Sequence, residues 1–370
     1  MGDGLPEDLI VNIFSRLPVK TLVRFRCACK RWNELIRSPD FVDIHFNANN
    51  QNEGARRGSI THHINGGAIF SVRVNEATAD LSLPVPDVER AVDVVGSSNG
   101  LVCLVVRPWD YALWNPATRE FRFLPKPEAK LGGRFNSLGS GFVFDPKSKD
   151  YKVAIITVRN DNGRYITQVD VFTLSSNSWK SIRLNLPSEV LRISSVRPVF
   201  VNGCSYWIAV LPWEGKNRRH ALLCYNIGKE NFRALIHLPC DLKDGFQASV
   251  KVSGDSLAMF VWTHNFSYPE RTWFDVWVLN EHGDGGANYS WSKQLSVGPL
   301  EMIALPYRFW VEDGVELVVL HIPDEATGGL NLFTFNPVTR QIKKFQGDCP
   351  HDGCTFPHEG CTYFESLIPV

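Results

Sequence analysis

A unit of short strands and tight turns recurs along most of the chain. Its clearest part is a hairpin in which a short apolar strand, a polar turn and a second strand follow one another. Five stretches fit this plan, the last with a long insertion at its turn: Leu113–Leu124, Val171–Ile182, Leu223–Leu235, Leu332–Phe345 and Asp275–Leu295. A repeat of roughly fifty residues is typical of the blades of a β-propeller.

A further pair of strands precedes each hairpin. These pairs are Ala91–Val95 with Leu101–Val106, Gly141–Asp145 with Tyr151–Val158, Val199–Val201 with Tyr206–Val210, Val250–Val252 with Leu257–Trp262, and Tyr307–Trp310 with Val315–His321. Short turns rich in Gly, Asn, Asp and Ser separate the two strands of each pair. The sequence therefore predicts five units of four strands, each sufficient for one blade.

The first and last strands of this region lack complete units. Residues 60–84 contain three candidate strands, including Ala68–Val74, but no clear opening strand, whereas Tyr363–Val370 reads as a strand without a unit. If the last strand completes the first blade, the ring closes and no edge stays exposed. We therefore predict an all-β propeller of about six blades, closed by the C-terminal strand. Two packed sheets are the alternative, because antiparallel strands alone do not fix closure.

A compact helical block precedes the strands. Pro6 suits a first helical position, and Glu7 and Asp8 complement the positive end of a helix dipole. Two apolar runs at helical spacing follow, separated by Pro18: Leu5, Leu9, Ile10, Ile13, Phe14 and Leu17, then Leu22, Phe25, Cys29, Trp32, Leu35 and Ile36. Three short helices in about forty residues bury too little surface to be stable alone. We expect much of this apolar surface to contact a partner.

The stretch between the helices and the strands is polar. Residues 47–57 (NANNQNEGARR) have no hydrophobic periodicity, which is typical of a linker. The chain is thus predicted to be an α+β multidomain protein. Its expected parts are a three-helix block at residues 1–46, a linker at 47–59 and the β domain at 60–370.

Composition excludes several classes of protein. Lys and Arg together number 39, as do Asp and Glu, so no net charge recruits nucleic acid or membrane. No apolar run reaches the length of a membrane span, and the acidic start lacks the features of a signal peptide. We expect a cytoplasmic or nuclear protein, or one present in both compartments. Five of the nine cysteines lie in apolar segments and are expected to be reduced core thiols: Cys27, Cys29, Cys103, Cys204 and Cys224.

The helical block resembles an F-box. Leu5-Pro6 opens it, Ile13 and Leu17-Pro18 close its first helix, and Arg26–Trp32 (RCACKRW) follows in the second. The resemblance implies docking onto a Skp-type adaptor, which joins the chain to a cullin-based ubiquitin ligase. The residues expected to bind the adaptor are Leu5, Pro6, Leu9, Ile10, Ile13, Leu17, Pro18, Leu22, Cys29 and Trp32. A small helical cap on the larger domain is the alternative interpretation.

The strand region resembles the plant F-box-associated interaction domain, a kelch-type domain. The matching segments are Ser97–Leu104 (SSNGLVCL), Trp114–Arg119 (WNPATR), Tyr151–Val153 (YKV) and Glu365–Leu367 (ESL). The Gly-Gly pair of true kelch repeats does not recur at a fixed place in each of these units. Together the two resemblances imply a non-catalytic substrate receptor of an SCF-type ubiquitin ligase, with no cofactor.

Strand order predicts where a target protein binds. In each unit the first-to-second and third-to-fourth turns lie on one face, and the second-to-third loops lie on the other. The latter are expected at residues 107–110, 159–164, 211–220, 263–272 and 323–329, and loops of this kind carry function. Their aromatic and arginine side chains are typical of interface anchors. The expected target-binding residues are Trp109, Tyr111, Trp213, Arg218, Arg219, Phe266, Tyr268 and Arg271. The alternative is that these aromatics pack between blades.

Two other groups of residues suggest different chemistry. Five zinc-type ligands lie close together, Cys349, His351, Cys354, His358 and Cys361, but their order matches no structural zinc spacing, so no metal site is predicted. The second helical run is basic through Lys20, Arg24, Arg26, Lys30, Arg31 and Arg37, which we interpret as a solvated face rather than a nucleic-acid site.

The sequence offers no strong catalytic motif. It has no phosphate-binding glycine loop or HExxH, and its one GxSxG match, Gly96–Gly100 (GSSNG), falls in a predicted turn between two strands. Because propellers also host glycosidases, Asp110, Glu214 and Asp275 are the candidate carboxylates of the runner-up function, a glycan-binding or glycan-processing propeller.

Overall fold

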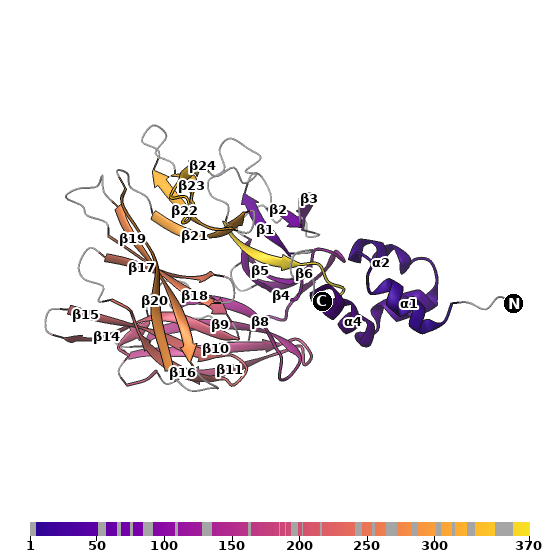
Figure 1. Cartoon of the computed structure of the whole chain (residues 1–370). Coiled ribbons are helices and arrows are strands. Elements are labelled where there is room, and N and C mark those ends of the chain that lie inside the picture. The colour runs from indigo at the N-terminus through magenta and orange to yellow at the C-terminus, as the bar shows by residue number, and fades with distance from the viewer. Residues whose placement is uncertain are drawn as a thin grey trace.

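The structure is a computed structural model that describes most of the chain. The described residues are 5–50, 57–64, 68–74, 77–83, 92–107, 110–127, 135–161, 164–184, 186–188, 190–193, 199–201, 203–214, 217–240, 246–253, 256–263, 272–282, 288–300, 305–312, 315–323, 330–344 and 358–370. Helices come first, and an all-β propeller follows them (Figure 1).

Four helices form the N-terminal block, one more than predicted. They are α1 (Glu7–Phe14), α2 (Val19–Phe25), α3 (Lys30–Arg37) and α4 (Pro39–Asn50). The second predicted run is divided, because Cys29 takes an extended conformation with φ −159° and ψ 161° and begins α3. Within the described residues, no helix is both long enough and apolar enough to cross a membrane.

Helix α4 overlaps the predicted linker. It continues to Asn50, and strand β1 begins at Arg57, so regular structure enters the predicted linker from both sides. Phe41, Val42 and His45 are buried and fix the first half of α4. In its polar second half, the Asn49 side-chain amide donates to the Ser15 carbonyl at 3.3 Å. Hydrogen bonding rather than apolar periodicity therefore ties this end of α4 to the rest of the block.

The described strands form six antiparallel sheets. In spatial order the first three are β25 (His358–Phe364), β1 (Arg57–Ile64), β2 (Ala68–Val74) and β3 (Ala77–Ser82); β4 (Asp93–Ser98), β5 (Leu101–Arg107), β6 (Asp110–Asn115) and β7 (Glu120–Phe123); and β8 (Phe135–Asp145), β9 (Asp150–Asp161), β10 (Arg164–Thr173) and β11 (Ser178–Leu184). In the fourth sheet, β12 (Arg192–Ile193) and β13 (Val199–Val201) both pair with β14 (Cys204–Glu214), which is followed by β15 (Asn217–Asn226) and β16 (Asn231–His237).

The last two sheets follow the same order. They are β17 (Phe246–Ser253), β18 (Ser256–Thr263), β19 (Thr272–His282) and β20 (Asn288–Leu300), then β21 (Leu305–Glu312), β22 (Val315–Pro323), β23 (Leu330–Phe335) and β24 (Ile342–Lys344). Five of the sheets are thus built from one contiguous stretch each, and they correspond to the five predicted units. The remaining sheet joins the first strands to the last, so the alternative of two packed sheets was wrong.

The C-terminal strand completes the first sheet, as predicted. Strand β25 pairs antiparallel with β1, and Arg57 lies opposite Phe364 in the register. The predicted bounds, Tyr363–Val370, were wrong because the strand ends at Phe364. Residues 365–370 leave the sheet, and Leu367 is buried among the side chains of the helical block.

The opening strands of neighbouring sheets contact one another. These contacts run from β25 to β4, β8, β13, β17 and β21 in turn, which makes them the inner strands of the propeller. In the first sheet β25 only pairs with β1, whereas in each of the other five sheets the inner strand leads directly into the second strand at one end of the propeller. We call this end, with its first-to-second and third-to-fourth turns, the turn face, and the opposite end, with the second-to-third connections, the loop face.

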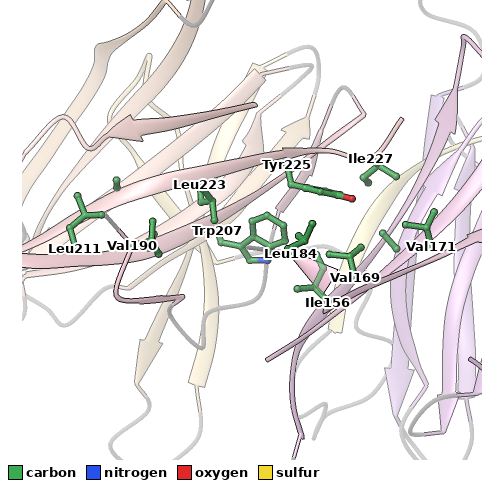
Figure 2. Close-up of a cluster of buried hydrophobic side chains, with 13 residues drawn as sticks. Ile156, Val169, Val171, Leu184, Val190, Trp207, Leu211, Leu223, Tyr225 and Ile227 are labelled. Carbon is green, nitrogen blue, oxygen red and sulfur yellow. The ribbon is translucent and has the colours of Figure 1, made fainter. Parts of the chain in front are cut away.

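Both sides of a blade are buried against its neighbours. Along β5, Leu101 and Cys103 belong to the core shared with the third sheet, whereas Val102, Leu104 and Val106 belong to the core shared with the first. Successive side chains of a strand point to opposite faces, so an unbroken apolar run fits a strand covered on both sides. Figure 2 shows the corresponding core between the third and fourth sheets, where Trp207 and Tyr225 lie among aliphatic side chains of β9 and β10.

One glycine allows two blades to approach closely. The ring of Phe200 in β13 occupies the space that a Cβ at Gly141 in β8 would need. At Gly96 a Cβ would instead lie 3.8 Å from the nearest atoms of Phe142, which is ordinary contact. Gly141 is therefore required by the approach of a neighbouring side chain, and Gly96 is not.

We predict that Gly141→Ala lowers the free energy of unfolding by about 1–3 kcal/mol through overpacking against Phe200. Gly96→Ala is the matched control and should change it by about 0.5 kcal/mol or less. Urea denaturation followed by tryptophan fluorescence measures both. Adding Phe200→Leu to Gly141→Ala should restore part of the loss, and equal effects of the two alanines would contradict this account.

Candidate functional site

Helix α1 carries a stripe of exposed aliphatic side chains. Leu5 just before the helix is 57% exposed, Leu9 51% and Ile13 49%. Residues four apart lie above one another on the same side of a helix, so Leu9 and Ile13 form one strip, and Leu5 stands just before its first turn. We call Leu5, Leu9 and Ile13 the α1 stripe. Scattered exposed leucines are ordinary, but an aligned apolar strip is typical of an interaction surface.

The opposite side of α1 faces the core of the helical block. Ile10 is 8% exposed and Leu22 is fully buried, so both belong to the core rather than to the predicted adaptor-binding surface. This corrects the expectation for these two residues. The reason is geometric: Ile10 follows Leu9 directly and is rotated by about 100° around the helix.

The other predicted adaptor-binding residues fall into two groups. Pro6, Pro18 and Cys29 are exposed, and Leu17 is half-buried. Trp32 is also half-buried, because its ring packs edge-on against Phe14 with centroids 5.1 Å apart. Sequence reasoning did not select Ile44, which is 45% exposed on α4.

The helical block lies on the turn face of the propeller. Arg26, which ends α2, forms an ion pair of 3.3 Å with Glu120 at the start of β7. Burial lowers the pKa of Arg26, while the carboxylate of Glu120 acts in the opposite direction. Ala117, in the turn between β6 and β7, packs against the helical core. Figure 1 accordingly shows the helices beside β6 and the C terminus.

Two basic residues of the second helical run are thus engaged in ion pairs. Arg26 bonds Glu120, and Arg31 bonds Glu7 at 3.0 Å on the surface of the block. The surface pair contributes about 0–1 kcal/mol, since solvent screens it.

The connections on the loop face are shorter than predicted at three places. Strands β5, β9 and β14 continue to Arg107, Asp161 and Glu214, and their partners begin at Asp110, Arg164 and Asn217. At 211–220 the expected loop is a hairpin in which Trp213 lies opposite Arg218. The ladder of backbone hydrogen bonds therefore extends through polar residues that the sequence analysis assigned to loops.

The predicted target-binding residues differ in their exposure, and only some of them lie within the described residues. Tyr111 is 4% exposed and lies in the core between the second and third sheets, so its prediction as a surface anchor was wrong. Burial raises the pKa of its phenol. Arg219 is exposed in part and pairs with Glu214 at 3.3 Å. Trp213 and Arg218 lie in strands β14 and β15, and the remaining four fall outside the described residues: Trp109, Phe266, Tyr268 and Arg271.

Sequence reasoning missed an exposed tryptophan on the loop face. Trp273 is 43% exposed near the start of β19, opposite Thr263 at the end of β18. Its position directly after the connection 264–271 was the signal that could have identified it. The described part of the loop face therefore presents Trp273 and the Arg219–Glu214 pair.

The three candidate carboxylates of a glycan-processing propeller lie in different sheets and do not form one site. Asp110 pairs with Lys126 at 2.9 Å, Glu214 with Arg219, and Asp275 with Lys293 at 2.8 Å. Each of these pairs belongs to a different sheet, so each carboxylate is neutralised locally.

The predicted zinc ligands are only partly described. His358 and Cys361 lie in β25, opposite His62 and Ile60, whereas Cys349, His351 and Cys354 fall outside the described residues. Over the part of the chain that is described, no group of three or more His, Cys, Asp or Glu could hold a metal ion.

The described cysteines are partly as predicted. Cys103, Cys204 and Cys224 are buried free thiols, whereas Cys27 and Cys29 are exposed, which corrects the expectation for these two. A hydrogen bond from Cys224 and the nearby Arg233 guanidinium lower the pKa of Cys204, against the opposing effect of burial. This pair lies inside the core between the fourth and fifth sheets, away from either candidate surface.

Comparison with known families agrees with this architecture. Residues 3–43 match the F-box domain, and residues 68–370 match the F-box associated beta propeller domain. The chain belongs to the F-box associated β-propeller family. The F-box match covers α1 to α3 and the start of α4, and it includes the α1 stripe. For brevity we refer to the whole helical block, α1 to α4, as the F-box.

Relatives of this F-box protein occur in Arabidopsis thaliana. An F-box/kelch-repeat protein is 27% identical over 345 residues, which cover 89% of this chain and 87% of the relative. A putative F-box protein is 27% identical over 239 residues, or 64% of this chain and 61% of the relative. The β-propeller domain of the Trilobed protease from Pyrococcus furiosus is similar in structure at a TM-score of 0.35 and 10% identity, covering 79% of this chain and 73% of that one. A likeness this weak says nothing about function.

The two sides of α1 should respond differently to truncation. We predict that Ile10→Ala lowers the free energy of unfolding by about 2–5 kcal/mol, because it leaves a cavity in the core of the F-box. Leu9→Ala, one residue away, should change it by about 0.5 kcal/mol or less, because Leu9 is half exposed. Denaturation followed by circular dichroism measures both, and a larger loss for Leu9→Ala would reverse the assignment of the two sides.

Proposed function

We propose that this F-box protein is the substrate-receptor subunit of an SCF-type cullin ubiquitin ligase. The observation that carries the proposal is the α1 stripe, which docks onto a Skp-type adaptor. Leu5, Leu9 and Ile13 each keep about half of their surface in water. Burying the exposed half of each against an apolar groove contributes roughly 1 kcal/mol per residue. Membership of the F-box family supports this assignment of the stripe.

The position of the F-box on the propeller supports a bridging role. The F-box contacts the turn face through Arg26 and Ala117, so the loop face lies at the other end of the propeller. In this proposal the adaptor occupies one end and a protein target the other. The chain itself has no catalytic role: it holds the target near a ubiquitin-charged enzyme and contributes proximity.

The proposed target surface is the loop face. Trp273 offers a large, partly exposed aromatic side chain, and Arg219 with Glu214 offers charges of both signs at its rim. Buried aromatic anchors surrounded by polar residues are typical of protein–protein interfaces. The remaining predicted anchors, Trp109, Trp213, Arg218, Phe266, Tyr268 and Arg271, belong to the same surface in this proposal. The ligase role also places the protein in the cytoplasm, the nucleus or both.

Adaptor binding tests the first half of the proposal. Leu9→Asp combined with Ile13→Asp puts two charges on the α1 stripe, and we expect the affinity for a Skp-type adaptor to fall at least 100-fold, measured by titration calorimetry. The control is Val338→Asp, because Val338 is 79% exposed in the turn between β23 and β24. Wild-type protein that does not bind the adaptor, or a double variant that binds normally, would refute the proposed function.

Target capture tests the second half. The Leu9→Asp/Ile13→Asp variant should accumulate targets that it can no longer deliver, and proximity labelling can identify them. We expect Trp213→Ala combined with Trp273→Ala to lose most of this labelling while retaining adaptor binding. Phe123→Ala is the control, since Phe123 is 47% exposed on the outer strand β7. An unchanged set of labelled proteins would show that the loop face is not the target surface.

A further inference from the structure

The residues that follow β25 enter the core of the F-box. We call Glu365–Val370 the tail. Leu367 is 2% exposed and belongs to the same core as Ile10, Phe14 and Leu22 of the helices. Ile368 packs against this core and also against the core between the second and third sheets. A segment from the far end of the chain thus supplies one of the buried aliphatic side chains of the F-box.

A single asparagine holds the tail in place. The Asn115 side-chain amide, fully buried at the end of β6, donates to the carbonyl oxygens of Ser366 at 3.0 Å and Ile368 at 2.8 Å. Its Oδ1 accepts from the backbone N–H groups of Ala117 at 3.0 Å and Thr118 at 3.2 Å. Both amide hydrogens and both lone pairs of Oδ1 are therefore used. One side chain fixes the turn between β6 and β7 and clamps the tail to it.

The same turn contacts the F-box a second time. Glu120 follows the turn and pairs with Arg26, whose side chain is 10% exposed. An ion pair sheltered from solvent is screened less than one on the surface. Burial raises the pKa of Tyr151 in β9, and the carboxylate of Asp43 in α4 adds to this effect. Helices α2 and α4 are thus both close to the propeller.

Chain topology explains why these contacts meet. Because Arg57 lies opposite Phe364, the first strand begins where the last strand ends. The start of β1 and the tail that departs from β25 therefore lie at the same end of the first sheet, on the turn face. The F-box is attached there by the chain at one point and by the inserted tail at another.

We infer that Ser366, Leu367 and Ile368 are positioning residues: with Asn115 they complete the F-box core and lock the F-box in one orientation on the propeller. Two separate attachments restrict rotation, which a single linker would leave free. The fixed orientation of the F-box on the propeller is a property of this chain and does not depend on a partner. Its consequence, a fixed path from the α1 stripe to the loop face, rests on the proposed function.

The experiment compares two asparagines in equivalent turns. Asn336, in the turn between β23 and β24, also accepts from two backbone N–H groups, those of Val338 at 2.9 Å and Thr339 at 3.0 Å. Aspartate preserves these acceptor contacts at both sites. At Asn115 it also removes both donors to the tail and sets a carboxylate against two carbonyl oxygens. Asn336→Asp is therefore the matched control for Asn115→Asp.

The readout is the distance between two spin labels on the full chain, attached through non-canonical amino acids at the exposed positions Asp40 in α4 and Lys229 in the turn between β15 and β16. Wild type and Asn336→Asp should give one narrow distribution. Asn115→Asp should broaden it at least twofold and increase hydrogen exchange in α1 to α4 more than tenfold. A distribution that stays narrow in Asn115→Asp, or is already broad in wild type, would overturn the inference.

Less disruptive variants test the same inference if Asn115→Asp fails to fold. Glu120→Gln removes only the charge that faces Arg26, and it should broaden the distribution in the same direction without loss of β-sheet content. Leu367→Met conserves the side-chain volume, so its distance distribution should remain narrow. Leu367→Ser removes most of the buried side chain, so its distribution should broaden. An unchanged width in both Glu120→Gln and Leu367→Ser would also overturn the inference. Adaptor affinity, measured separately, distinguishes failure of the proposed function, because the label distance does not depend on the adaptor.

Discussion

The pairing of β1 with β25 is the interaction on which the rest of this structure depends. It joins Arg57 to Phe364, nearly the whole propeller apart in sequence. Closing a loop of this length costs little more entropy than closing one half as long, about 0.6 kcal/mol per doubling. The stabilisation gained is large, because the pairing covers the edge of the first sheet and brings the start of β1 next to the start of the tail. The position of the F-box on the turn face follows from this one register.

Much of the fold could be predicted from sequence because both sides of a blade are buried. Runs such as Leu101–Val106 are apolar throughout and bounded by turn residues, so their existence and order are clear. Prediction failed where tertiary contacts, rather than the periodicity of apolar residues, determine the local structure. Helix α4 extends through polar residues that hydrogen bonds hold, as at Asn49. The tail reads as a strand because its aliphatic residues suit one, yet Leu367 is buried among helices.

The candidate surfaces were harder to predict than the elements that carry them. On α1, helical spacing identified Leu9 and Ile10 together, and only the packing of the block separates the exposed residue from the buried one. On the propeller, Tyr111 and Trp273 are both aromatic residues near second-to-third connections, and one is buried whereas the other is exposed. Alternation along a strand does not separate these two outcomes, because both sides of a blade are covered. Contacts with the neighbouring sheet decide them, and those contacts are not visible in a single sequence.

The tail changes what counts as a transferable unit in this protein. A contiguous helical module could be joined to any recognition domain. In this chain the folded unit is discontinuous: it consists of residues 5–50 together with Leu367 from the far end. Substitutions in the helical core and in the tail must therefore remain compatible as the sequence diverges. Chimeras that exchange only the helices would combine an F-box with a tail shaped for a different core.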